Sequence, residues 1–181
     1  MDVPITHIIG TVALIGLVIS VALAYGIIVD YIEANVLKSQ VKQIAEYVSM
    51  NLVNLISLTE FAYGDLSSPT VMTKTLELPE DLNENPYLVR LVNESGNCYV
   101  EVKLITRSDI SARSPIPLNS TRAHITIATE ETINGINSIF PDETITLFTT
   151  VYGGNPNIII WCWKYDSDTI YAGLGIQAGG T

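Results

Sequence analysis

The first part of the chain is apolar without interruption. Residues 8–29 form a run of 22 consecutive uncharged, mostly apolar residues. A helix rises about 1.5 Å per residue, so this run would reach about 33 Å, the thickness of a bilayer's hydrocarbon core. We predict a helix that can span a membrane. A buried core helix is disfavoured because the run carries no charge, and a cleavable secretory signal is disfavoured because residues 1–4 include no basic residue.

Beyond residue 29 the apolar residues follow a helical period. Steps of three and four draw one stripe, with polar side chains on the other faces. No proline occurs between Pro4 and Pro69. We therefore predict one continuous helix from about residue 3 to about residue 59, with Pro4 in its first turn and Asp2 as N-cap. The residues of the stripe are Leu37, Val41, Ile44, Ala45, Val48, Leu52, Leu55 and Ile56.

A different pattern begins after a hinge predicted at residues 61–70, where Gly64, two serines and Pro69 cluster. Short runs there alternate apolar and polar residues and are rich in β-branched and aromatic types. Seven such runs favour an α+β chain: a helix over 1–60, then an antiparallel β-sandwich over 71–181 of the size of an immunoglobulin-like domain. An exposed loop is predicted at 107–122. The predicted strands are 71–78, 87–92, 98–106, 123–129, 144–152, 158–165 and 169–176.

Composition separates the two parts further. The 181 residues are 48% hydrophobic and only 15% charged, with a formal net charge of −10. Asp2 is the single charged residue before position 30, so the acidic surplus belongs almost wholly to the remainder. Phosphate binding needs clustered lysine and arginine, so nucleic acid is not expected as a partner.

The chain offers little support for catalysis. His7 and His124 lie in different regions, and neither has a second histidine or a cysteine at metal-ligand spacing. Phosphate-binding loops and nucleophile elbows are not found. Acidic pairs such as Glu130-Glu131 are more typical of a solvated surface than of a calcium site. We therefore expect no enzyme, no metal and no cofactor.

Aromatic residues mark one face of a predicted strand. Trp161, Trp163 and Tyr165 alternate along it, opposite Cys162. This pattern favours the core of the β domain over a contact between subunits.

Two cysteines and two asparagines bear on location. Outside the cytosol, Cys98 and Cys162 favour a disulfide joining strands, with two buried thiols as the alternative. Asn93 and Asn119 lie in glycosylation sequons beside predicted turns. Together with the helix, these features favour an external β domain. The lysines that follow the apolar run would by themselves place the β domain inside, because basic residues favour the cytoplasmic side. We set this aside because a processed N-terminus would have lost the basic leader that preceded the apolar run.

Small residues mark one side of the apolar half. Such residues let helix backbones approach closely where apolar surfaces do not discriminate among partners. The alternative is that glycine and alanine are simply common in membrane helices. The residues concerned are Gly10, Ala13, Ser20 and Ala24.

The layout of a long two-part helix followed by a small β-rich domain resembles the type IV pilin superfamily, in particular its archaeal pilins, adhesion-filament subunits and archaellins. Residues 5–56 are similar to the family's helix in length, apolarity and breakpoint. Bacterial pilins carry a glutamate where this chain has Ile5, which favours the archaeal branch. The family's short basic leader is removed by a dedicated peptidase, so its absence is expected if the sequence is the mature form.

The resemblance implies a structural subunit of an extracellular helical filament for adhesion or motility. Its partners would be copies of itself, the membrane before assembly and the filament-assembly machinery. A helix that is apolar on every face must be surrounded on every face. The alternative is a membrane-anchored extracellular β-sandwich that binds the cell envelope. The residues expected to pack in the filament core are Ile5, Ile8, Ile9, Val12, Leu14, Ile15, Leu17, Val18 and Val21.

Overall fold

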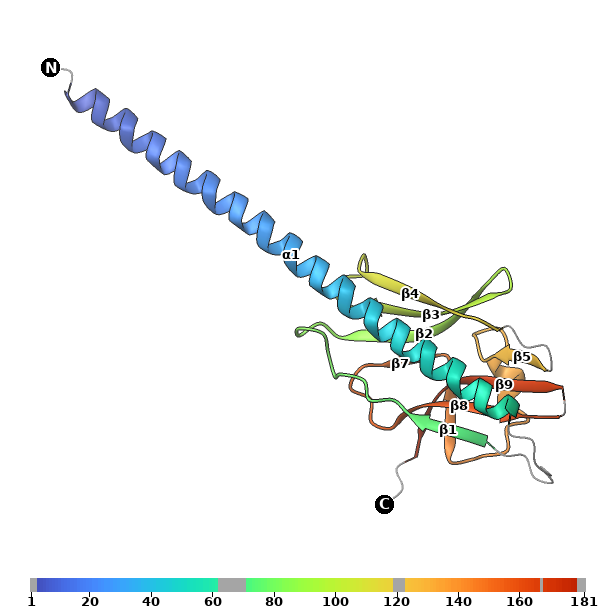
Figure 1. The fold of residues 1–181 in the computed structure, drawn as a ribbon. Helices are drawn as coiled ribbons and strands as arrows, with labels where there is room; N and C mark the ends of the chain where they lie inside the picture. The colour runs from blue at the N-terminus through green and yellow to red at the C-terminus, as the bar shows by residue number, and fades with distance from the viewer. Residues whose placement is uncertain (1–2, 62–70, 119–122, 167, 179–181) are drawn as a thin grey trace. The chain divides into compact units, whose positions relative to one another are not determined.

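A single long helix opens the fold, as the hydrophobic pattern predicts (Figure 1). The computed structural model describes residues 3–61, 71–118, 123–166 and 168–178, with side chains from Ile8 onward. Helix α1 spans Val3–Phe61, which confirms its predicted extent. By compactness the chain divides into residues 1–37 and 38–181, so the division falls within α1. The predicted hinge, apart from Phe61, lies outside the described residues.

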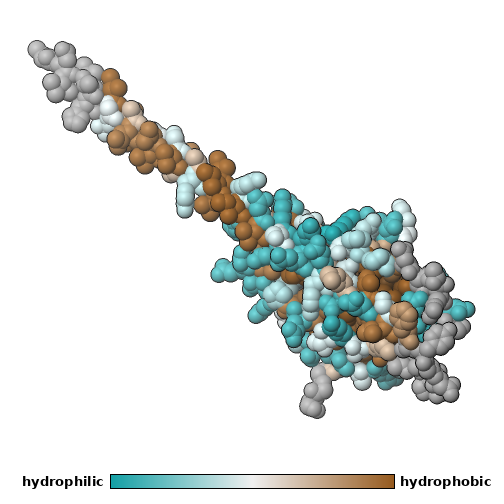
Figure 2. Space-filling model, in the orientation of Figure 1, coloured by the Kyte–Doolittle hydropathy of each residue, from teal (hydrophilic) through white to brown (hydrophobic). Residues whose placement is uncertain are grey.

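The first unit is an apolar helix with its side chains exposed. Every residue from Ile8 to Glu33 is exposed, and Figure 2 shows hydrophobic surface along this part of α1. The helix is long and apolar enough to cross a membrane, a criterion that a signal sequence near the N-terminus also meets. The first unit therefore offers an apolar surface on all sides.

The amphipathic part of α1 belongs to the second unit, except for Leu37, the last residue of the first unit. The predicted stripe is buried at every position, with exposures between 0% and 8%. Polar side chains beside the stripe bond to strands: Ser49 Oγ donates to the Pro115 carbonyl at 2.6 Å, and Lys74 Nζ donates to Asn51 Oδ1 at 2.6 Å. This part of the helix therefore packs on the β domain of its own chain.

Two sheets make up the rest of the second unit. The five-stranded sheet has the order β1-β8-β9-β5, with β6 also paired to β9. Its pairs are antiparallel except β5 with β9, which is parallel. Its strands are β1 (Val71–Thr75), β5 (His124–Ile127), β6 (Ile145–Phe148), β8 (Ile158–Lys164) and β9 (Thr169–Gln177).

The four-stranded sheet has the order β4-β3-β2-β7 and is antiparallel throughout. A two-residue turn joins β2 to β3, with Ser95 and Gly96 at φ values of 54° and 85°. Both residues take the left-handed conformation that such hairpin turns require. Its strands are β2 (Tyr87–Glu94), β3 (Asn97–Leu104), β4 (Ser111–Ile116) and β7 (Thr150–Tyr152).

Two sequence predictions are corrected by the strands. Residues 107–122 were predicted as a loop, but β4 lies within them; as an edge strand it tolerates Pro115, which has no N–H for a ladder bond. The predicted strand 144–152 is two strands, because the chain passes from one sheet to the other at Thr149. A short helix, α2 (Ile133–Asn137), lies between β5 and β6.

Trp161 lies at the centre of the core on one face of the five-stranded sheet. It is fully buried, its Nε1 donates to the Leu174 carbonyl at 2.8 Å, and the Phe140 ring meets it edge-on at 4.9 Å. Trp163 belongs to the same cluster, which confirms the core prediction for both tryptophans. Tyr165, at the end of the row, is 52% exposed.

Candidate functional site

The predicted filament-core residues share one environment. Those from Ile8 to Val21 are 53–65% exposed, values that large aliphatic side chains rarely keep in a folded domain. The side chain of Ile5 lies outside the described residues. The structure therefore presents these residues as a continuous apolar surface on α1.

The small residues of α1 are equally open. A methyl group added at Gly10 would meet no atom within 4 Å. Ser20 donates its hydroxyl to the Gly16 carbonyl one turn earlier, at 2.8 Å. Ala13 and Ala24 are also exposed. Within the described chain, nothing occupies the space that these small side chains leave.

The predicted disulfide is wrong. Cys98 and Cys162 are both free and buried. Cys98 lies on β3, paired across the ladder with Asn93 and Ile116, whereas Cys162 lies on β8 in the other sheet. Burial raises the pKa of both thiols, that of Cys162 to about 12. At neutral pH both are protonated and unreactive.

The remaining single-residue predictions fall on exposed or undescribed positions. Asn93 is exposed at the end of β2, where its Oδ1 accepts the Gly96 N–H at 3.1 Å. Asn119 lies outside the described residues. His124 begins β5, and the side chain of His7 is not described. Over the described residues, no group of three or more His, Cys, Asp and Glu gathers where a metal ion could bind.

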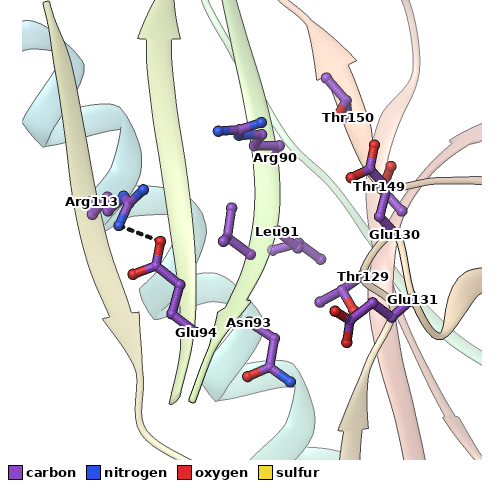
Figure 3. Close-up of a pocket in the computed structure, with 11 residues that line it drawn as sticks. Arg90, Leu91, Asn93, Glu94, Arg113, Thr129, Glu130, Glu131, Thr149 and Thr150 are labelled. Carbon is purple, nitrogen blue, oxygen red and sulfur yellow. Dashed lines mark hydrogen bonds and ion pairs between the residues drawn. The ribbon is translucent and has the colours of Figure 1, made fainter. Parts of the chain in front are cut away.

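A polar cavity of about 180 Å³ lies beside the four-stranded sheet (Figure 3). Its lining comes from β2 (residues 90–94), from Arg113 on β4, and from two chain segments at residues 129–131 and 149–150. These segments are remote in sequence: β4, β3, β2 and β7 are neighbours in one sheet, and residues 129–131 follow β5 of the other. A second cavity of about 260 Å³ lies between residues 96–99 and 115–118, but its lining includes no charged side chain.

A buried carboxylate organises the charges next to this cavity. Glu101 is 5% exposed and accepts hydrogen bonds from Arg90 Nε and from Arg113 Nε, the latter at 2.7 Å. Arg113 also donates from Nη1 to Glu94 at 2.8 Å. Burial by itself raises the pKa of Glu101, but the hydrogen bonds and charges of the two arginines outweigh it and hold this pKa below its ordinary value.

The network keeps charged groups in fixed positions at the cavity edge. Because Glu101 and Glu94 together hold the two guanidinium groups, Arg90 and Arg113 stand next to the cavity in defined orientations. Glu130 and Glu131 are exposed at its opposite side (Figure 3). The arrangement can bind a polar molecule through carboxylate, guanidinium and threonine hydroxyl groups.

This cavity was not predicted from the sequence, which marked only Glu130 and Glu131 as an acidic pair. The available signal was a charged residue at an outward-facing position of each of three strands: Arg90, Glu101 and Arg113. Without the strand order, that signal cannot be assembled into a site. Comparisons with protein-family models, with curated proteins and with solved structures find no match to the chain.

Proposed function

We propose that this chain is the structural subunit of an extracellular helical filament of the type IV pilus kind, used for adhesion or motility. The observation that supports this proposal is the exposed apolar surface of α1. Burying one such Val, Leu or Ile side chain is worth about 1.5–3 kcal/mol relative to leaving it in water. A row of them along one helix therefore has to be covered by lipid or by other protein.

Neighbouring copies can cover every face of this helix. Before assembly the bilayer would surround it, since its length suits the hydrocarbon core. In a filament the same faces would pack against equivalent helices of other copies, at contacts that repeat without closing. The exposed small residues would let those helices approach closely. The chain needs no catalytic residue for this role, and its partners are copies of itself and the assembly machinery.

The second unit would form the outer coat of the filament. It carries most of the acidic residues of the chain and all of its lysines and arginines, which favours contact with water. We keep an antiparallel sandwich of the immunoglobulin type as the proposed description of this coat. The parallel pairing of β5 with β9 departs from that type.

Shearing of producing cells tests the proposal. We expect electron microscopy of the sheared material to show filaments, and mass spectrometry of purified filaments to find this chain as the main component. If the chain is recovered only in membrane fractions and sheared material holds none of it, the filament proposal fails, and a membrane-anchored binding module takes its place.

A further inference from the structure

The cavity beside the four-stranded sheet exists because one strand pairing ends early. Strand β7 pairs with β2 as far as Arg90, and the Leu91 N–H donates to the Thr149 carbonyl at 3.1 Å. Strand β2 continues to Glu94 with β3 on one side only. Backbone groups alternate in direction along an antiparallel strand, so the amide and carbonyl of Asn93 point to the side that β7 has left. That side is the cavity, which Asn93 lines.

Hydrogen bonds to neighbouring residues fix the polar groups around the cavity. Arg90 and Arg113 bond to the buried carboxylate of Glu101, and Arg113 also bonds to Glu94. On the opposite side, the backbone N–H of Thr129 donates to Thr132 Oγ1 at 2.9 Å, which fixes the start of the segment that carries the two glutamates. Groups fixed in this way lose little freedom on binding a ligand.

The charges of the lining exclude some classes of ligand. Three carboxylates, Glu94, Glu130 and Glu131, face two guanidinium groups that already bond to carboxylates. An anion would therefore enter a region of net negative charge. A bare divalent cation is disfavoured because the described residues contain no metal-binding cluster of carboxylates.

We infer that this cavity binds a single sugar ring that carries no acidic group. Each sugar hydroxyl both donates and accepts, so one ring can use carboxylate acceptors, guanidinium donors and threonine hydroxyls together. Glu130 and Glu131 accept from ring hydroxyls or from a ring ammonium, and Arg90 and Thr150 donate from the β2–β7 side. The cavity volume of about 180 Å³ matches one ring and excludes a longer oligosaccharide from full burial.

The affinity for one ring is expected to be weak. No aromatic side chain lines the described cavity, so the stacking that strengthens many polar sites is missing. Here the inference rests on the proposed function: a filament repeats the cavity once per subunit, and such repetition raises avidity by about 10²–10⁴. Binding by the single chain requires no filament, so the two proposals fail separately.

Ligand-observed saturation-transfer NMR on the full chain in detergent micelles tests the inference. The probes are glucose, galactose and mannose, with glucosamine and glucuronate as charged rings and ethylamine as an ammonium without a ring. We expect transfer to at least one neutral hexose or to glucosamine at millimolar concentration, and none to glucuronate or ethylamine. The inference is overturned if no ring binds, if glucuronate binds as well as the neutral rings, or if ethylamine binds as well as glucosamine.

Matched variants locate the binding. The double variant Glu130→Gln and Glu131→Gln, and separately Thr150→Val, should each weaken binding about tenfold or more, as expected for loss of hydrogen bonds to a bound ligand. Glu143→Gln and Thr146→Val change the same residue types at exposed positions away from the cavity and should leave binding unchanged. Equal binding by all variants would place the sugar elsewhere and would also overturn the inference.

Discussion

Glu101 lies in register with Arg90 on β2 and with Arg113 on β4, and it accepts a hydrogen bond from each. The pairing places one buried carboxylate between two half-exposed guanidinium groups on the central strand β3. A carboxylate buried to this degree needs such partners, because burial alone disfavours its charged form. The three residues therefore tie together the strands that border the polar cavity.

Removing the charge of Glu101 should destabilise the second unit. We expect Glu101→Gln to lower the free energy of unfolding by about 1–3 kcal/mol, below the value for a fully buried pair, because both arginines are partly solvated. Urea unfolding of the full chain in micelles, followed by tryptophan fluorescence, measures this change. Glu94→Gln is the control: its carboxylate is 52% exposed, so its loss should cost less than about 0.5 kcal/mol. Equal effects of the two variants would contradict the special role of Glu101.

The same carboxylate predicts a pH dependence. Its pKa is lowered in the folded chain, so its contribution is fully present above the unfolded carboxylate pKa of about 4.3 and is lost as pH falls through the lower folded pKa. The difference in melting temperature between the natural chain and Glu101→Gln should therefore be full at about pH 6 and should shrink below about pH 4. A difference that stays constant down to about pH 3 would contradict the lowered pKa.

Gly173 is required by the packing of Trp161. A Cβ at position 173 would lie 2.6 Å from Cζ2 of the Trp161 ring and 2.7 Å from the Ala128 Cβ. We expect Gly173→Ala to lower the free energy of unfolding by about 1–3 kcal/mol, the usual cost of overpacking a core. Gly135→Ala, where the added methyl group meets no atom within 4 Å, should be neutral or stabilising by up to about 1 kcal/mol. Thermal unfolding of both variants checks the prediction, and a neutral Gly173→Ala would refute it.

The two cysteines should behave as buried thiols. Because both are free and buried, we expect a thiol reagent to label neither rapidly in the folded chain and both after unfolding. Mass spectrometry counts the labels, without any reductant in the sample. If the unfolded chain is labelled only after reductant is added, Cys98 and Cys162 form a disulfide and this prediction is wrong.

The apolar part of α1 can be tested within the filament proposal. Leu14→Asp or Val18→Asp should abolish filaments, because a carboxylate at a helix–helix contact in the core would be buried without a partner. Leu14→Met keeps the apolar character and should leave filaments intact. Tryptophan fluorescence should show the β domain still folded in all three variants. Filaments of normal appearance from Leu14→Asp would contradict the proposed core.

An aspartate in the apolar run disturbs membrane insertion as well as helix packing. A second kind of substitution tests helix packing alone. Gly10→Leu or Ala13→Leu keeps the run apolar but fills the space beside an exposed small residue. If the small residues serve close helix packing, these variants should still fractionate with membranes yet form fewer filaments. Normal filament yield would favour the alternative, in which the small residues have no packing role.

The helix was predictable from local pattern because its two periodicities are properties of consecutive residues. An uninterrupted apolar run and a stripe at steps of three and four can be read without knowing any distant contact. The stripe from Leu37 to Ile56 is buried at every position. Most strands were found for the same reason, since alternation of apolar and polar residues reports one covered face.

The predictions that the structure corrects are those that depend on which strands are neighbours. Strand β4 carries prolines and serines that resemble a loop, and only its place at a sheet edge makes such a strand tolerable. The residues at 144–152 look like one strand because alternation continues while the chain changes sheets. Cys98 and Cys162 look like a pair in the sequence, but both thiols are free in the folded chain.

An apolar helix joined to an acidic, strand-rich domain can be predicted from local composition and period alone. The folded chain adds that Arg90, Glu101 and Arg113 meet, that the two cysteines are not bonded, and that a polar cavity opens where β7 leaves β2. Strand order and register are set by long-range pairing, so a cross-strand contact between residues far apart in sequence exists only once that pairing has formed.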